Sequence, residues 1–231
     1  CDDPIVVGSM ADPYEGGWYP SLFSSRGTGT TGPLIMAHGE NIRAAEANST
    51  NEYVTESGTS FSTPAISGII ALMMDASNGS STLNFYIEDF GKSGFDPVCG
   101  NGEVLAYDSI KAAGGYSSGS FNDYRDHIRA SDTMQQGDIH AYDINVYATS
   151  SNLYWATTLI MTDEDSDDFD LYIWNPGSDP SVDPLDYSST SVDPQEVISF
   201  KPTTTGVYTV AVHAFSGNGN YALDFSGQIR P

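Results

Sequence analysis

The segment at residues 58–64 constrains this chain most, because it reads GTSFSTP and runs directly into the apolar stretch AISGIIALMM. Small residues at its start permit a tight turn from a strand into a helix. Pro64 fits the first turn of a helix, where its missing N–H costs no hydrogen bond. The apolar stretch predicts a helix that is buried on most sides. Such a turn presents the Ser60 hydroxyl at a helix N-terminus, where backbone N–H groups and the helix dipole stabilise an oxyanion.

A loop of Ser, Thr and Gly that only caps a buried helix has the same composition, so this segment alone does not establish a site. Residues 58–68, however, resemble the nucleophile segment of the subtilisin-like serine proteases, which is usually written GTSMAxPHVAG. The resemblance implies that Ser60 is the nucleophile and that Thr59 assists at the oxyanion hole. Phe61 stands where the family often has Met, and Ala65 stands where it usually has His.

Three blocks before this segment follow the order found in the same family. They read VVGSM, FSSRG and LIMAHG and begin at residues 6, 23 and 34. They resemble the family succession VIAVGA, FSxxG and VMAPG. Residues 99–105 resemble the glycine-rich closing strand of the family, and residues 107–113 predict a final helix. We therefore expect residues 1–116 to form the C-terminal portion of a subtilisin-like α/β peptidase domain.

Residues 81–91 also predict a helix. Leu83, Ile87 and Phe90 recur at helical spacing, a Ser or Thr precedes them as an N-cap, and Gly91 follows as a C-cap.

The character of the sequence changes after a Gly/Ser-rich break at residues 114–120. We expect an all-β sandwich or jelly-roll domain over residues 121–231, because short strand patterns alternate there with turns. The domain resembles the β-domain that follows the catalytic domain in many subtilases, through elements that read LIMTD, DFDL and YAL. The expected strands are residues 140–147, 154–161, 168–174, 196–200, 206–212 and 220–225.

The resemblance implies acyl transfer, in which Ser60 attacks a peptide carbonyl, a histidine takes its proton and an aspartate orients that histidine. In subtilisin the chain order is Asp, His, Ser, yet residues 1–59 contain neither the aspartate-glycine block nor the His-Gly-Thr block of the family. His38 lies in a block that the family uses as a structural turn. We therefore expect the isolated chain to be inactive, with the other triad members upstream or on another chain. The remaining histidines are expected on the surface or in the sheets of the β-domain: His127, His140 and His213.

The chain is strongly acidic, with a formal charge of −23, only 8 Lys+Arg against 31 Asp+Glu, and a sequence pI of about 4.1. This balance excludes nucleic acid and anionic membranes as partners, since both require a basic surface. It fits adaptation to brine, binding of divalent cations, or simply an acidic extracellular protein. No apolar run reaches the ~18 residues that a membrane-spanning helix needs. We expect a secreted or cell-surface protein, in which Cys1 and Cys99 form a disulfide if they meet.

The densest acidic run, residues 163–170, carries carboxylates at six of its eight positions. Such a run repels itself unless cations or solvent screen it, and Ca²⁺ takes about six to eight oxygen ligands. One interpretation is a structural calcium site, and the other is a solvated acidic loop. The spacing does not match an EF-hand. The expected ligands are Asp163, Asp165, Asp168 and Asp170.

Three functions remain open from the sequence. The first is a secreted serine endopeptidase that acts on protein or peptide substrates and whose N-terminal half is a separate segment. The second is a catalytically inactive subtilase-like protein with a structural or assembly role. The third is a binding module, in which the β-domain holds protein or glycan.

Overall fold

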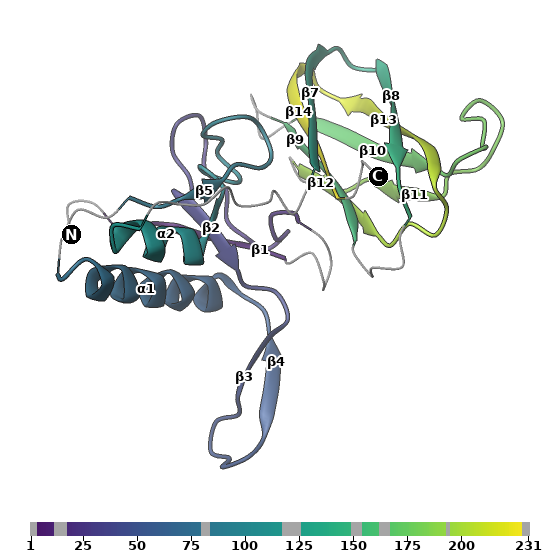
Figure 1. Ribbon diagram of the computed structural model, residues 1–231. Coiled ribbons are helices and arrows are strands. Elements are labelled where there is room, and N and C mark those ends of the chain that lie inside the picture. The colour runs from purple at the N-terminus through teal and green to yellow at the C-terminus, as the bar shows by residue number, and fades with distance from the viewer. Residues whose placement is uncertain are drawn as a thin grey trace. The chain divides into compact units, whose positions relative to one another are not determined.

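The computed structural model describes residues 4–11, 18–79, 84–116, 126–148, 154–161, 167–192 and 195–227. Its elements are mostly β-strands in several sheets, with two helices among the described residues (Figure 1). The chain forms two compact units, of which the first comprises Cys1–Ala11 and Pro20–Asp123 and the second Asp12–Tyr19 and Tyr124–Pro231. Most of the predicted linker lies outside the described residues, so the domain limits 1–116 and 121–231 stay predictions.

The first unit is built on a mixed sheet in the order β1-β2-β6-β5. β1 and β2 run parallel, β6 runs parallel to β2, and β5 runs antiparallel to β6. The bounds of these strands are Val7–Met10 for β1, Ile35–His38 for β2, Ile87–Glu88 for β5 and Glu103–Val104 for β6. The block VVGSM, the first of the three that resemble the family, therefore forms β1 from its second residue onward.

Two helices and a hairpin complete the first unit. Helix α1 (Thr59–Ala76) packs on β1, β2 and helix α2 (Ala106–Ala113). Around Ile66 of α1, the buried residues Ile35, Ala37 and Val104 form a small core. The hairpin of β3 (Ile42–Ala45) and β4 (Tyr53–Glu56) connects the sheet to α1 and extends away from both (Figure 1).

Two predictions about α1 are wrong. Pro64 lies in the second turn of the helix rather than in the first, because the helix already begins at Thr59. The helix is also not buried on most sides. Ser62, Ile66 and Met73 are its buried residues, whereas Leu72 and Met74 are 55% and 42% exposed. The sheet and α2 cover one face of this apolar helix, and the apolar residues on its other side face outward.

The helix predicted over residues 81–91 is also wrong in its described part. Ile87 and Glu88 form strand β5, in which Ile87 pairs with Val104 and Glu88 with Glu103. The helical spacing of apolar residues was therefore overridden by pairing with β6, the next strand in the chain. The final helix was correctly predicted, since α2 covers residues 106–113.

The second unit contains two four-stranded antiparallel sheets, in the orders β11-β10-β13-β8 and β12-β9-β14-β7. This arrangement fits the predicted β-sandwich. The first sheet comprises β8 (Ile139–Val146), β10 (Asp168–Trp174), β11 (Tyr187–Ser189) and β13 (Gly206–Ser216). The second comprises β7 (Asp126–Met134), β9 (Trp155–Met161), β12 (Gln195–Phe200) and β14 (Gly219–Gly227).

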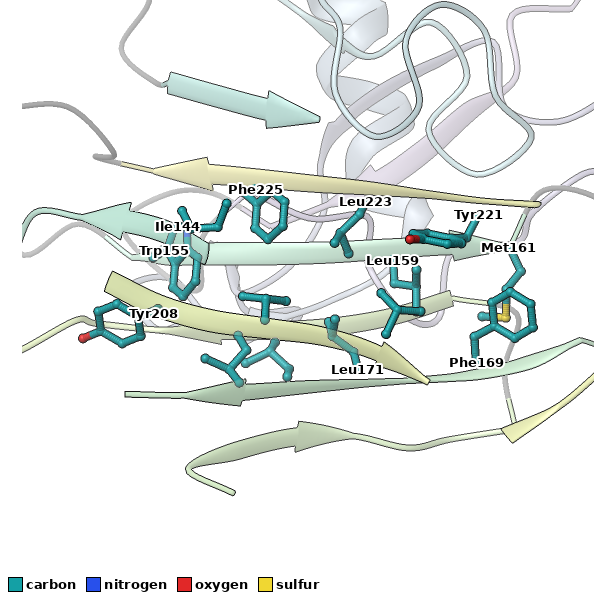
Figure 2. Close-up of a cluster of buried hydrophobic side chains, with 14 of the residues drawn as sticks. Ile144, Trp155, Leu159, Met161, Phe169, Leu171, Tyr208, Tyr221, Leu223 and Phe225 are labelled. Carbon is teal, nitrogen blue, oxygen red and sulfur yellow. The ribbon is translucent and has the colours of Figure 1, made fainter. Parts of the chain in front are cut away.

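Alternating side chains from both sheets build one hydrophobic core (Figure 2). Trp155 of β9 stacks near Phe225 of β14 and makes edge contacts with Phe200 of β12, at centroid distances of 6.5 and 5.1 Å. Leu159 and Leu223 are completely buried. Because one face of each sheet is apolar, a shift of one residue in register would expose this core, so the pairing is strongly specified.

Candidate active site

The nucleophile segment is held where the parallel strands β1 and β2 end. The N–H of Gly39, just after β2, donates to the carbonyl of Met10 at 3.0 Å. The N–H of Gly58, just before α1, donates to the carbonyl of Gly39 at 2.8 Å. These two bonds tie the start of α1 to the carboxyl ends of both strands. In open α/β sheets this edge is where ligands bind.

Gly39 is required by close packing at this junction. A Cβ atom there would lie 2.2 Å from Ser62 Oγ, 2.4 Å from Ser9 Oγ and 2.8 Å from the carbonyl oxygen of Gly58. At each of these distances a neighbouring atom would have to shift, and the last contact involves the backbone. The absence of a side chain at Gly39 therefore lets the strand end and the helix start approach each other.

Ser60 is the second residue of α1, and it is exposed. No side chain caps the helix, and its first turn contains no carboxylate. Positive partial charge from the helix N-terminus is therefore not neutralised by a neighbouring acid beside the Ser60 hydroxyl. Pro64 has no N–H to offer the carbonyl of Ser60. The hydroxyl of Thr63 donates to the carbonyl of Thr59 at 3.0 Å and supports the same turn.

A network of buried serines supports the strand end beneath this turn. Ser9 Oγ lies 2.8 Å from Ser21 Oγ, and the N–H of Ser9 donates to Ser24 Oγ at 3.0 Å. All three serines are buried. Buried hydroxyls are stable only when they are hydrogen-bonded, so this network fixes the end of β1 against residues 20–24.

Comparison with known proteins identifies this part of the chain. Residues 1–85 match the family described as the Subtilase family. We call residues 1–85 the subtilase segment after this match. The match includes β1, β2, the β3–β4 hairpin and α1, and with them Ser60.

A solved structure is also similar to part of the chain, at 14% sequence identity and a TM-score of 0.32. It is the crystal structure of Aeromonas hydrophila PliG, a periplasmic lysozyme inhibitor of g-type lysozyme. The match covers 48% of this chain and 91% of that chain. Among the described residues, neither helix has the length and hydropathy needed to cross a lipid bilayer.

The subtilase segment does not bring a histidine to Ser60. Among the described residues, no imidazole forms a hydrogen bond with Ser60, and each of the four histidines of the chain lies against a carboxylate elsewhere. His38, inside the segment, is directed to β6. The pairs are His38 with Glu103 at 3.1 Å, His127 with Asp224 at 2.9 Å, His140 with Asp132 at 3.6 Å and His213 with Asp170 at 3.6 Å.

The predicted calcium ligands are only partly described. Asp163 and Asp165 lie outside the described residues. Asp168 and Asp170 lie on β10, where Asp168 Oδ1 is buried without a hydrogen-bond partner within the described part of the chain. Burial, reinforced by the charge of Asp170, raises the pKa of Asp168. The unpartnered oxygen suits a cation ligand, whereas Asp170 already accepts the hydroxyl of Tyr172 at 2.7 Å.

Two carboxylates supply fewer oxygens than the about six to eight that Ca²⁺ takes. The described residues contain no group of three or more His, Cys, Asp or Glu side chains arranged to hold a metal ion. The calcium hypothesis therefore depends on Asp163 and Asp165.

Sequence reasoning missed a buried carboxylate, Asp96, in the loop before β6. It is 1% exposed, and its Oδ1 accepts the N–H groups of Val98 and Cys99 at 2.8 and 2.7 Å. Burial raises its pKa to about 6 even though these hydrogen bonds act in the opposite direction. The Asp-Pro dipeptide in a glycine-rich loop was the available signal. Cys99 beside it is buried, and Cys1 lies outside the described residues, so their disulfide stays a prediction.

Proposed function

We propose that this chain is part of a secreted subtilisin-like serine endopeptidase with Ser60 as its nucleophile. The observation that supports this best is the exposed Ser60 hydroxyl at the uncapped N-terminus of α1, in a subtilase segment and beyond the carboxyl ends of β1 and β2. The N–H of Ser60 and the side chain of Thr59 are the groups that we assign to the oxyanion hole.

The reaction that we propose is peptide-bond hydrolysis through an acyl-enzyme. Ser60 Oγ forms a bond to the carbonyl carbon while its proton passes to a histidine. That histidine returns the proton to the amine as the C–N bond breaks, and water then releases the acyl group by the reverse sequence. The N-terminus of α1 stabilises the oxyanion in each tetrahedral intermediate.

The histidine and its orienting aspartate come, in this proposal, from the N-terminal half of the same protease, which lies upstream or on another chain. Two features of the first unit bear on such a partner. Leu72 and Met74 expose apolar surface on α1, and β1 pairs with β2 alone among the described strands, although Pro20 and Ser21 already bond to the other edge of β1 at Met10 and Ser9. The apolar helix face is the surface that a further segment would cover.

The test is labelling with a fluorophosphonate probe followed by peptide mapping. The 231-residue chain alone should label poorly, because a serine without an adjacent base is a weak nucleophile. Addition of the upstream segment should produce labelling at Ser60 and peptidase activity. Ser60→Ala in the complete protein should remove the label and lower turnover by several orders of magnitude. Ser67→Ala, at a second exposed serine of the same helix, is the matched control and should leave both unchanged.

The alternative is a catalytically inactive subtilase-like protein with a structural or assembly role. It is favoured by the pairing of all four histidines with carboxylates away from Ser60. If the complete protein folds but never labels, this alternative replaces the peptidase. Labelling at another residue, or full activity of Ser60→Ala, would remove Ser60 from the mechanism.

Three further properties belong to the same proposal. We expect an extracellular location, stabilisation by salt in keeping with the charge of −23, and a structural Ca²⁺ held by Asp163, Asp165, Asp168 and Asp170. Asp168 supports the site best among the described ligands, because its Oδ1 is buried without a hydrogen-bond partner in the described part of the chain.

A further inference from the structure

One short segment belongs to the second unit although the residues before and after it belong to the first. This segment is Asp12–Tyr19, which follows β1 closely in the chain. Trp18, one of its two described residues, shows how the segment is held. The chain therefore passes between the two units on both sides of Trp18.

Trp18 is held by β7 and β14, which are neighbouring strands of the second unit (Figure 1). Its indole ring stacks on the imidazole of His127, with the ring centroids 6.0 Å apart and the planes inclined by 19°. Its carbonyl accepts the hydroxyl of Ser226 at 3.3 Å. His127 and Ser226 lie opposite each other in the strand register, so both contacts fix Trp18 at one place. We call Trp18, His127, Asp224 and Ser226 the Trp18 anchor.

The groups of the anchor on β14 are polar and face away from the core of the sandwich, yet they are buried. Asp224 and Ser226 flank the core residue Phe225 along the strand, so they lie on the opposite face of the sheet. They are nevertheless only 4% and 3% exposed. Asp224 lies 2.9 Å from His127 Nδ1 and 3.8 Å from Arg129 Nε, and these partners compensate the burial of its charge. Buried and compensated polar groups on an outer sheet face fit a permanent contact rather than a surface exposed to water.

A short series of backbone contacts connects the residues after Trp18 to the start of α1. Pro20, two residues after Trp18, forms an antiparallel bridge with Met10 at the end of β1. The carbonyl of Met10 accepts the N–H of Gly39 at 3.0 Å. The carbonyl of Gly39 accepts the N–H of Gly58 at 2.8 Å. Because Gly58 begins the nucleophile segment, this series ends where the candidate nucleophile is held.

We propose that the Trp18 anchor positions the nucleophile segment, so that the second unit takes part in assembling the candidate active site. Trp18 acts through the end of β1 and touches no substrate, so it is a positioning residue. A displacement of about 1 Å in an active site can cost roughly a hundredfold in rate. This catalytic consequence rests on the proposed peptidase function, whereas the positioning itself is measurable without peptidase activity.

Hydrogen exchange of backbone amides in the 231-residue chain measures the positioning. Trp18→Ala removes the stacked ring, so the N–H groups of Gly39 and Gly58 should exchange about tenfold faster as their junction opens more often. Trp18→Phe keeps a ring on His127 and should restore slow exchange. Phe215→Ala, which removes a 60% exposed ring of the second unit outside the anchor, is the matched control and should change neither amide.

An amide of the first unit outside this series separates positioning from overall stability. The N–H of Leu105 donates to the carbonyl of Tyr86 at 2.9 Å and should exchange at the same rate in Trp18→Ala. The proposal is overturned if Gly39 and Gly58 exchange at unchanged rates in this variant, or if Leu105 accelerates as much as they do.

Fluorophosphonate labelling of the complemented protein tests the catalytic consequence. Trp18→Ala should label at Ser60 at least several-fold more slowly, and Trp18→Phe should label at nearly the normal rate. Faster exchange at the junction together with undiminished labelling would overturn the positioning role of Trp18. If the exchange effect is present but the unchanged protein never labels, the proposed peptidase function fails and the positioning of the segment stands.

Discussion

The two units of this protein differ in how completely they enclose their hydrophobic residues. In the second unit two sheets meet face to face, and Trp155, Leu159 and Leu223 between them are at most 1% exposed (Figure 2). In the first unit a helix lies on a short sheet, so Ile66 is buried while Leu72, on the same apolar helix, is 55% exposed. The first unit carries the candidate nucleophile, and the second carries the closed core.

The two units therefore contribute differently. The second mainly provides folding stability, and the first carries the candidate catalytic chemistry. A closed core stabilises the fold without any additional segment, because nearly all of its apolar surface is already removed from water. An apolar helix with one open face gains more when another segment covers that face. The candidate active site lies at the N-terminus of this half-covered helix. Completion of the first unit and completion of the site are therefore, in our proposal, the same event.

The sharpest test of this contrast is a matched pair of truncations. Leu223→Ala should cost about 3–5 kcal/mol, because the interdigitated core around it cannot collapse into the cavity. Ile66→Ala should cost about 2 kcal/mol, at the low end of the same range, since one side of α1 is free to relax. All three tryptophans belong to the second unit and both described helices to the first. Tryptophan fluorescence therefore follows the first variant and far-UV circular dichroism the second.

Equal costs for the two variants would show that the first unit is as tightly closed as the second. Addition of the complementing segment sharpens the test further. It should raise the cost of Ile66→Ala toward that of Leu223→Ala, because the helix then loses its freedom to relax.

Local structure was predictable from the sequence where it is determined by neighbouring residues in the chain. The start of α1 follows from the small residues before Ser60, and most strands of the second unit follow from alternation. β9 and β10, for example, lie within a residue of their predicted limits. β7 was missed because Asp126–Met134 reads DHIRASDTM, in which polar residues interrupt the alternation. β7 forms because it pairs with β14, although its own residues lack the alternation that indicates a strand.

Contacts between residues that are far apart in the chain were not predictable, because neighbouring residues do not determine them. The burial of α1 depends on which segments cover it, and the helix sequence is apolar whether or not they are present. Asp170 was predicted as a calcium ligand from its neighbours in sequence. Its observed partners are the hydroxyl of Tyr172 and the imidazole of His213, which reaches it from another strand.

Asp96 predicts a pH dependence that belongs to the first unit. Its pKa is raised from 3.8 to about 6 in the folded state, so the folded protein binds more protons than the unfolded chain between these values. The stability that this group contributes is therefore fully present below about pH 4 and is lost as the pH rises through 6. The shift corresponds to about 3 kcal/mol. Far-UV circular dichroism during urea unfolding at several pH values measures it.

Asp96→Asn is the control that isolates this group from the other carboxylates. The amide oxygen can still accept the N–H groups of Val98 and Cys99, while the titration disappears. The difference in unfolding free energy between the two proteins should change across this pH window and stay constant above it. A constant difference at all pH values would place the folded-state pKa of Asp96 at its ordinary value.

Gly39→Ala tests the junction between β2 and α1. The added Cβ meets Ser62 Oγ, Ser9 Oγ and the Gly58 carbonyl at 2.2–2.8 Å, and overpacking of this kind typically costs about 1–3 kcal/mol. The start of α1 should move, so fluorophosphonate labelling of Ser60 in the complemented protein should fall as well. Gly68→Ala is the matched control, because a Cβ there meets no atom within 4 Å. Equal labelling of both variants would show that the junction does not position Ser60.

Salt and calcium should give the smallest effects, and they should fall mainly on the second unit. That unit contains the acidic run and the long stretch without Lys or Arg. Screening of this repulsion by molar KCl should stabilise it by about 1 kcal/mol, which raises the melting midpoint by roughly 2–4 °C in a chain of this size. Tryptophan fluorescence after chelation measures this shift.

Millimolar Ca²⁺ should add a further increase if the predicted site forms, and Asp168→Asn should abolish only that increase. A response to KCl without a response to Ca²⁺ would assign the acidic run to solvation. An unchanged midpoint in both would remove brine adaptation and calcium binding as explanations of the acidic composition.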